Sequence, residues 1–135
     1  MRTGLDTSVV LRLLVGEPAA QAAAARSWLT ELLKAGHAVV VSDIVIAESY
    51  HAMVYHYGFS KKDALAALFK MLVSRTVTAT GQAAAVLLEE KLATATLGFV
   101  DRLIHAGYLA SGNQWATFEK GAAKLPKTVL LNAVP

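Results

Sequence analysis

The sequence predicts an α/β protein in which a central parallel sheet of four to five strands is covered by helices on both faces, a three-layer α/β/α sandwich. Short β-branched stretches, such as residues 37–41 (HAVVV) and 128–131 (TVLL), alternate with longer stretches of alanine and leucine at helical spacing. This alternation is typical of parallel sheets whose two faces are buried. The 135 residues contain no internal repeat and no Pro/Gly/Ser-rich linker, so a single domain over residues 1–135 is expected.

The boundaries of the elements follow from helix-ending and helix-starting residues. Gly16 and Pro18 close the first helix, and Gly36 follows the second, where a helix C-terminus favours glycine. Ser42 is expected to be the N-cap of the third helix, and Gly58 separates the third from the fourth. The expected strands are residues 2–5, 37–41, 76–79, 113–118 and 128–131. The expected helices are residues 8–15, 19–35, 44–57, 60–74, 81–94 and 99–111, followed by one helical turn at 119–124.

The composition narrows the class of protein without identifying it. The absence of cysteine excludes disulfides and thiolate metal sites, and it suits a reducing cytosol. No apolar stretch approaches the ~18 residues that span a bilayer, and the start MRTGLDTSVVLRLL has no signal-peptide pattern, so a cytoplasmic protein without a membrane partner is expected. The net charge of +3 permits an anionic partner, and the 55% hydrophobic content suggests contact with another chain.

Four acidic residues lie where a parallel sheet binds its ligands, at or beyond the carboxyl ends of strands. Asp6 ends the first strand, Glu48 lies in the helix that follows the second, Asp101 lies near a helix start, and Glu119 follows the strand-like NQWATF. Two of them also have a structural interpretation: Asp6 as a helix N-cap, and Asp101 as an acid that the helix dipole favours. Asp43, in the first turn of its helix, is assigned to that dipole role alone.

Carboxylates that converge repel one another unless a hard divalent cation neutralises them. Mg²⁺ and Mn²⁺ prefer oxygen ligands, and cations held in this way catalyse phosphoryl displacement by water. The strand ends therefore suggest a metal-dependent hydrolase. Glu48 and His51 also have the E-x-x-H spacing of di-iron helical bundles. No second E-x-x-H occurs, however, and the β-branched strands argue against an all-helical protein.

The ordered set of these stretches resembles the PIN-domain ribonucleases, in particular the VapC-type toxins of bacterial VapBC toxin–antitoxin systems. The resemblance is carried by LDTSVVLRLL with Asp6 and Ser8, by SDIVIAE with Glu48, and by FVDRLIHAGYLASGNQWATFE with Asp101. It spans nearly the whole chain. No one of these stretches is diagnostic, but their order is far more specific than any part. The resemblance implies that Asp6, Glu48 and Asp101 bind metal and that Ser8 supports the first acid.

The fourth acid departs from the family pattern. The family typically has an aspartate after a Thr-Phe dipeptide, whereas here Thr117 and Phe118 precede Glu119. The substitution keeps the charge and lengthens the side chain by one methylene. Glu119 therefore either coordinates the cation directly or acts through a water molecule, and Thr117 takes a supporting position beside it.

The resemblance implies an endoribonuclease that depends on Mg²⁺ or Mn²⁺ and cleaves RNA with a metal-activated water, as the toxin of a type II toxin–antitoxin system. The expected partners are RNA, a small antitoxin protein and a second copy of the chain. Arg12, Arg102 and His105 either contact substrate phosphates or are ordinary residues of helix faces. The alternative function is a non-catalytic PIN-like scaffold that binds a protein or RNA without cleaving it.

Overall fold

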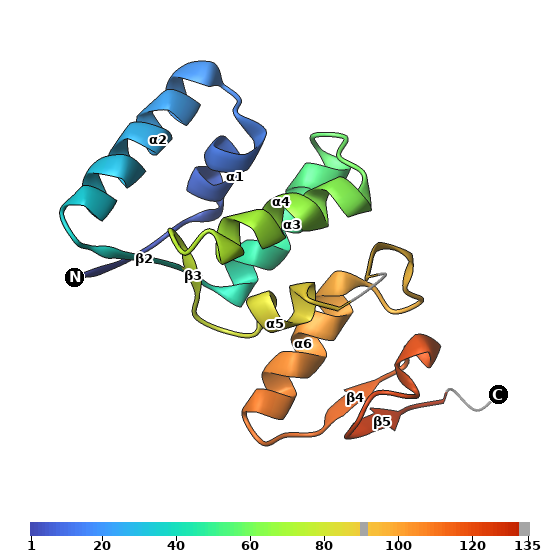
Figure 1. Ribbon diagram of the computed structural model, residues 1–135. Helices are drawn as coiled ribbons and strands as arrows, with labels where there is room; N and C mark the ends of the chain where they lie inside the picture. The colour runs from blue at the N-terminus through green and yellow to red at the C-terminus, as the bar shows by residue number, and fades with distance from the viewer. Residues whose placement is uncertain (90–91, 133–135) are drawn as a thin grey trace.

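The structure, a computed structural model, describes residues 1–89 and 92–132 (Figure 1). It contains helices and parallel strands, which confirms the predicted mixed α/β class. The strands are β1 (Arg2–Gly4), β2 (Ala38–Val41), β3 (Thr78–Ala79), β4 (Trp115–Thr117) and β5 (Thr128–Leu130). The α-helices are α1 (Thr7–Val15), α2 (Ala19–Lys34), α3 (Asp43–Tyr55), α4 (Lys61–Val73), α5 (Ala83–Leu87) and α6 (Phe99–Ala110), and two 3₁₀ turns are η1 (Leu92–Thr94) and η2 (Lys120–Ala122).

The strands form two separate sheets instead of the single sheet of four to five strands that the sequence predicted. In the larger sheet β2 lies between β1 and β3, and all three are parallel, with Thr3 opposite Val39 and Val40 opposite Thr78. The smaller sheet pairs β4 with β5, also in parallel. Figure 1 shows this pair beside α6 and apart from β1. The periodicity that identifies a strand does not identify its neighbours, so the sequence could not reveal this division.

The helices around β2 begin and end where their caps predict. The hydroxyl oxygen of Ser42 accepts a hydrogen bond of 3.3 Å from the backbone N–H of Val45, which caps α3 as expected. Ser60 caps α4 in the same way, with 3.0 Å to the backbone N–H of Asp63. Gly36, just past α2, adopts a positive φ of 80°, which glycine reaches without steric cost. These caps place the start of α3 directly at the carboxyl end of β2.

The predicted helix over residues 81–94 is wrong in length. Its first part is α5, which ends at Leu87, and the 3₁₀ turn η1 begins at Leu92; residues 90–91 lie outside the described residues. Leu87 and Leu92 are both buried. In one continuous α-helix, residues five apart point about 140° away from each other. In one continuous helix the two leucines would lie on different faces, whereas the break lets both pack in the main core.

Helix α6 joins the two hydrophobic clusters that the described residues form. Phe99 and Leu103 are buried in the main core, where Phe99 meets the ring of Tyr50 on α3 edge-on at 5.2 Å between centroids. The second cluster is small and is built around Leu97 and Trp115. Burial, with a smaller electrostatic contribution from Tyr55, raises the pKa of the Tyr50 hydroxyl above its ordinary value, so this ring remains a neutral packing group. Contacts from α3 and from β4 thus hold α6 in place.

No helix in the described part of the chain combines the length and the apolar character that a bilayer span needs.

Ser49, on the inner face of α3, gives a prediction about stability. Its side chain is fully buried, and its hydroxyl oxygen has no hydrogen-bond partner among the described residues. An unpaired buried hydroxyl costs desolvation free energy. We expect Ser49→Ala to raise the free energy of unfolding by about 1 kcal/mol, measured by urea denaturation.

The same substitution at Ser60 is the matched control. Ser60→Ala removes a cap hydrogen bond and should lower the free energy of unfolding by about 1 kcal/mol. If Ser49→Ala were as destabilising as Ser60→Ala, its hydroxyl would be shown to have a partner.

Candidate active site

Asp6 lies at the carboxyl end of β1, at the N-cap position of α1. Its backbone has the extended conformation of an N-cap residue (φ −81°, ψ 160°), but its side chain accepts no capping hydrogen bond from the helix. The carboxylate instead accepts a hydrogen bond of 3.2 Å from the hydroxyl of Ser8. The side chain of Asp6 is thus exposed to solvent. Ser8 holds its orientation, and the carboxylate is not used to cap the helix.

Glu48 is brought to the same end of the sheet by α3, which follows β2. Its Oε1 accepts a hydrogen bond of 3.2 Å from the hydroxyl of Thr7, the residue after Asp6. Since β1 and β2 are parallel neighbours, the elements that follow them meet at one edge of the sheet, as predicted. Thr7 is the residue that the sequence interpretation missed. Its signal is its place directly after Asp6 in the stretch D-T-S, in the first turn of a helix.

The first turns of α6 form one wall of the hollow in which Glu48 lies. This hollow has a volume of about 550 Å³, and Thr7, Glu48, His51 and His56 line it together with apolar side chains of α3 and α6. Asp101 lies in the first turn of α6 and is half-buried. Its helix, though not its carboxylate, therefore adjoins the hollow of Glu48.

Glu119 belongs to the smaller sheet. It follows β4, is exposed, and its backbone N–H donates a hydrogen bond of 3.1 Å to the hydroxyl of Thr117. Thr117 thus contacts the backbone of Glu119, and its supporting role toward the carboxylate stays a prediction. Because β4 does not pair with β1, the sheet does not carry Glu119 to Asp6.

The PIN domain family model matches residues 5–127, a range that includes all four predicted acids. The chain belongs to the PIN domain family. Proteins of this family are generally nucleases. Searches among curated proteins and among solved structures returned no significant match.

PIN-domain nucleases generally use divalent metals. The acids of this PIN domain would therefore have to bind such a cation. Asp6 and Glu48 offer carboxylate oxygens, the ligand type that Mg²⁺ and Mn²⁺ prefer. Within residues 1–89 and 92–132, however, no three acidic or histidine side chains lie close enough together to hold a metal ion. The two carboxylates suit the cation in ligand type, but the four-acid pocket expected from the sequence is not formed in this structure, and the metal-binding roles stay predictions.

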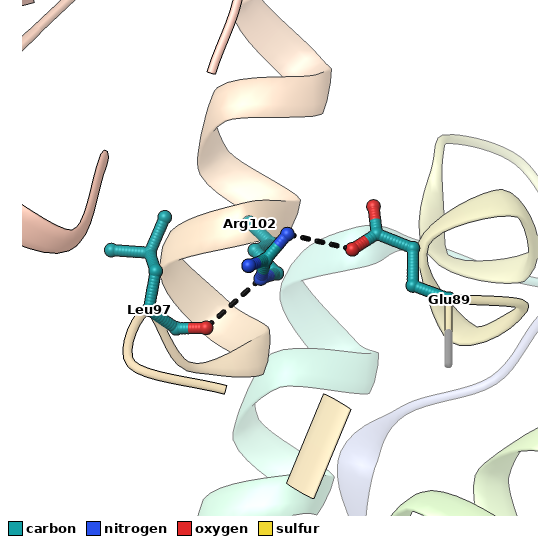
Figure 2. A network of polar contacts seen from close by, with 3 residues as sticks. All are labelled: Glu89, Leu97 and Arg102. Carbon is teal, nitrogen blue, oxygen red and sulfur yellow. Dashed lines mark hydrogen bonds and ion pairs between the residues drawn. The ribbon is translucent and has the colours of Figure 1, made fainter. Parts of the chain in front are cut away.

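Two predicted substrate contacts of the PIN domain have structural partners instead. The guanidinium of Arg102 donates to the backbone oxygen of Leu97 at 2.9 Å and forms a 2.7 Å ion pair with Glu89 (Figure 2). The imidazole of His105 is buried, and its Nε2 donates to the backbone oxygen of Pro126 at 2.8 Å. Both residues line a different hollow, between α5, α6 and the segment before β5. These contacts fix the start of α6 and the position of the smaller sheet.

Asp43 also does more than the dipole role that the sequence suggested. It lies in the first turn of α3 as expected. Its carboxylate additionally accepts hydrogen bonds of 3.0–3.1 Å from the backbone N–H groups of Gln82 and Ala83, at the start of α5. The chain approaches so closely here that a Cβ atom on Gly81 would collide with the Asp43 carboxylate. Asp43 thus ties α3 to α5, which in turn packs against α6.

Proposed function

We propose that this PIN domain is an endoribonuclease that requires Mg²⁺ or Mn²⁺ and acts as the VapC-type toxin of a type II toxin–antitoxin system. The observation that carries the proposal is that Asp6 and the helix of Glu48 follow the parallel neighbours β1 and β2, and that Thr7, the residue after Asp6, donates a hydrogen bond to Glu48. Membership of a family whose proteins are generally nucleases supports it.

The side chains around the two carboxylates suit phosphodiester hydrolysis. A divalent cation bound there would activate water and neutralise the charge that develops on phosphate oxygens. The protein itself contributes orientation. Ser8 and Thr7 each donate one hydrogen bond to Asp6 and Glu48 respectively, so each carboxylate keeps further lone pairs for another ligand. No protein nucleophile is needed, which agrees with the absence of cysteine.

The other two predicted acids do not line the hollow of Glu48. Asp101 is proposed as the third metal-binding acid because the first turns of its helix adjoin the hollow of Glu48. Glu119 is proposed to act through water, which agrees with its longer side chain and with its position on the smaller sheet.

The proposed partners are single-stranded or structured RNA, a small antitoxin protein and a second copy of the chain. A net charge of +3 permits an anionic substrate. Large apolar side chains at the surface, among them Ile44 with 73% and Tyr55 with 67% of its surface exposed, supply contact area for a protein partner.

The proposal is tested against the scaffold alternative with purified, partner-free protein and structured RNA. A nuclease should cleave the RNA with Mg²⁺ or Mn²⁺, should stop in EDTA, and should lose this activity in Asp101→Asn. RNA binding without cleavage under any divalent cation would support the scaffold instead. Co-expression with the product of a small upstream reading frame tests the toxin assignment separately, since an antitoxin should suppress the cleavage.

A further inference from the structure

Another hollow opens at Ser8, the residue that donates a hydrogen bond to Asp6. It lies between α1 and α2, has a volume of about 310 Å³, and is lined by Ser8, Arg12, Gln21, Trp28 and small or aliphatic side chains. The hydroxyl of Ser8 donates to Asp6, so this hollow begins one hydrogen bond away from the candidate active site.

The polar groups of this hollow are held in place by each other. Arg12 Nε donates a hydrogen bond of 2.6 Å to Gln21 Oε1, which links the two helices. The bond occupies one nitrogen of the guanidinium and the oxygen of the amide. Among residues 1–89 and 92–132 the structure describes no partner for the two Arg12 Nη groups, which are the donors best suited to a phosphate.

The apolar part of the hollow includes the indole ring of Trp28. Trp28, on α2, keeps 38% of its surface exposed. Ala24 and Ala25, on the same helix, also line the hollow and fill little of it. An exposed indole next to small side chains and an arginine is the combination on which unpaired bases stack in proteins that bind single strands.

We propose that this hollow binds one unpaired nucleotide of the RNA substrate, adjacent to the phosphate that meets Asp6. Its base stacks on Trp28, its phosphate contacts Arg12, and the free amide N–H of Gln21 faces the base edge. The inference rests on the proposed ribonuclease function, and it adds the place where the strand is held. Neither Trp28 nor Gln21 was assigned such a role from the sequence.

Tryptophan fluorescence tests this in EDTA, where no cleavage occurs. The chain has two tryptophans, and Trp115 is buried in the second hydrophobic cluster. We expect a short single-stranded oligoribonucleotide to quench the emission of Trp28 saturably, both in the wild type and in Trp115→Phe. The quenching should disappear in Trp28→Phe, which keeps an aromatic ring for stacking.

Fluorescence anisotropy of the same oligonucleotide, carrying a label, measures the Kd of each variant. Trp28→Ala should raise the Kd roughly 5- to 100-fold, the range found for loss of one stacked base, whereas Trp28→Phe should retain most of the affinity. Tyr57→Ala is the matched control, because Tyr57 is 37% exposed but lies between α3 and α4. Circular dichroism checks that each variant is folded.

Arginine variants test the phosphate contact. Arg12→Ala should weaken binding and reduce the salt dependence of the Kd by about one phosphate contact. Arg26→Ala, which removes the same charge from α2 outside the hollow, should leave the Kd within about twofold because exposed charges at a distance are screened.

Absence of quenching, or a Trp28→Ala protein that binds as tightly as the wild type, would overturn the nucleotide site. Metal-dependent cleavage could still be present in that case, so the proposed function would stand. Conversely, quenching and weakened binding in Trp28→Ala without cleavage under any divalent cation would support the nucleotide site while overturning the nuclease.

Discussion

Glu48→Gln is expected to slow the cleavage of RNA by a factor on the order of 10²–10³, the usual cost of removing one electrostatic element from a catalytic site. Glutamine keeps the shape of the side chain and an oxygen that can accept the hydrogen bond from Thr7. Only the negative charge that would hold a cation is lost. Initial rates at saturating RNA and fixed Mn²⁺ measure the effect.

Glu31→Gln is the control for this prediction. Glu31 is an exposed acid on α2, in a 4.0 Å pair with Lys34, and lies outside the hollows around Asp6 and Glu48. Its substitution should leave the cleavage rate within about twofold, because exposed charges are screened. Equal rates for wild type and Glu48→Gln would remove Glu48 from the catalytic machinery.

Asp43→Ala should have the largest effect on stability, lowering the free energy of unfolding by about 2–3 kcal/mol. The substitution removes a charged acceptor shared by two backbone N–H groups and leaves those donors half-buried without a partner. Urea denaturation measures the change. Asp63→Ala is the control, because Asp63 is likewise in the first turn of a helix but is exposed. Its loss should cost less than about 1 kcal/mol.

A double-mutant cycle with Gly81 shows whether the contact itself is responsible. Gly81→Ala places a methyl group against the Asp43 carboxylate and should destabilise the wild type. In the Asp43→Ala background the same methyl group meets no carboxylate, so its cost should fall and the two effects should not add. Simple additivity would contradict the described contact between α3 and the start of α5.

Features that depend on neighbouring residues in the chain, such as helix caps and strand ends, were predictable from the sequence. Ser42 marks the start of α3, and Asp6 and the helix of Glu48 follow the carboxyl ends of β1 and β2. The pairing of strands and the break after Leu87 depend on tertiary packing, which one sequence does not reveal. The same holds for Asp43, whose partners lie about forty residues away in the chain.

In the candidate site, too, positions set by neighbouring strands were predictable, whereas contacts between distant segments were not. Asp6 and Glu48 could be placed at one sheet edge because parallel neighbouring strands end together. Thr7, the residue after Asp6, reaches Glu48 only because α1 packs on α3. Arg102 and His105 looked like surface residues that could meet a phosphate. In the structure, the ion pair with Glu89 and the hydrogen bond to Pro126 engage them within the protein.

The most direct test is the rate of RNA cleavage by protein stripped of metal with EDTA and then titrated with Mn²⁺. We expect no cleavage in EDTA, a saturable rise in rate as Mn²⁺ is added, and fragments with 5′-phosphate and 3′-hydroxyl ends, since water attacks phosphorus and the 3′ oxygen leaves. Asp6→Asn should remain inactive throughout the titration. Cleavage that persists in EDTA and leaves cyclic phosphate ends, or an Asp6→Asn protein as active as the wild type, would contradict a metal-dependent nuclease centred on Asp6 and Glu48.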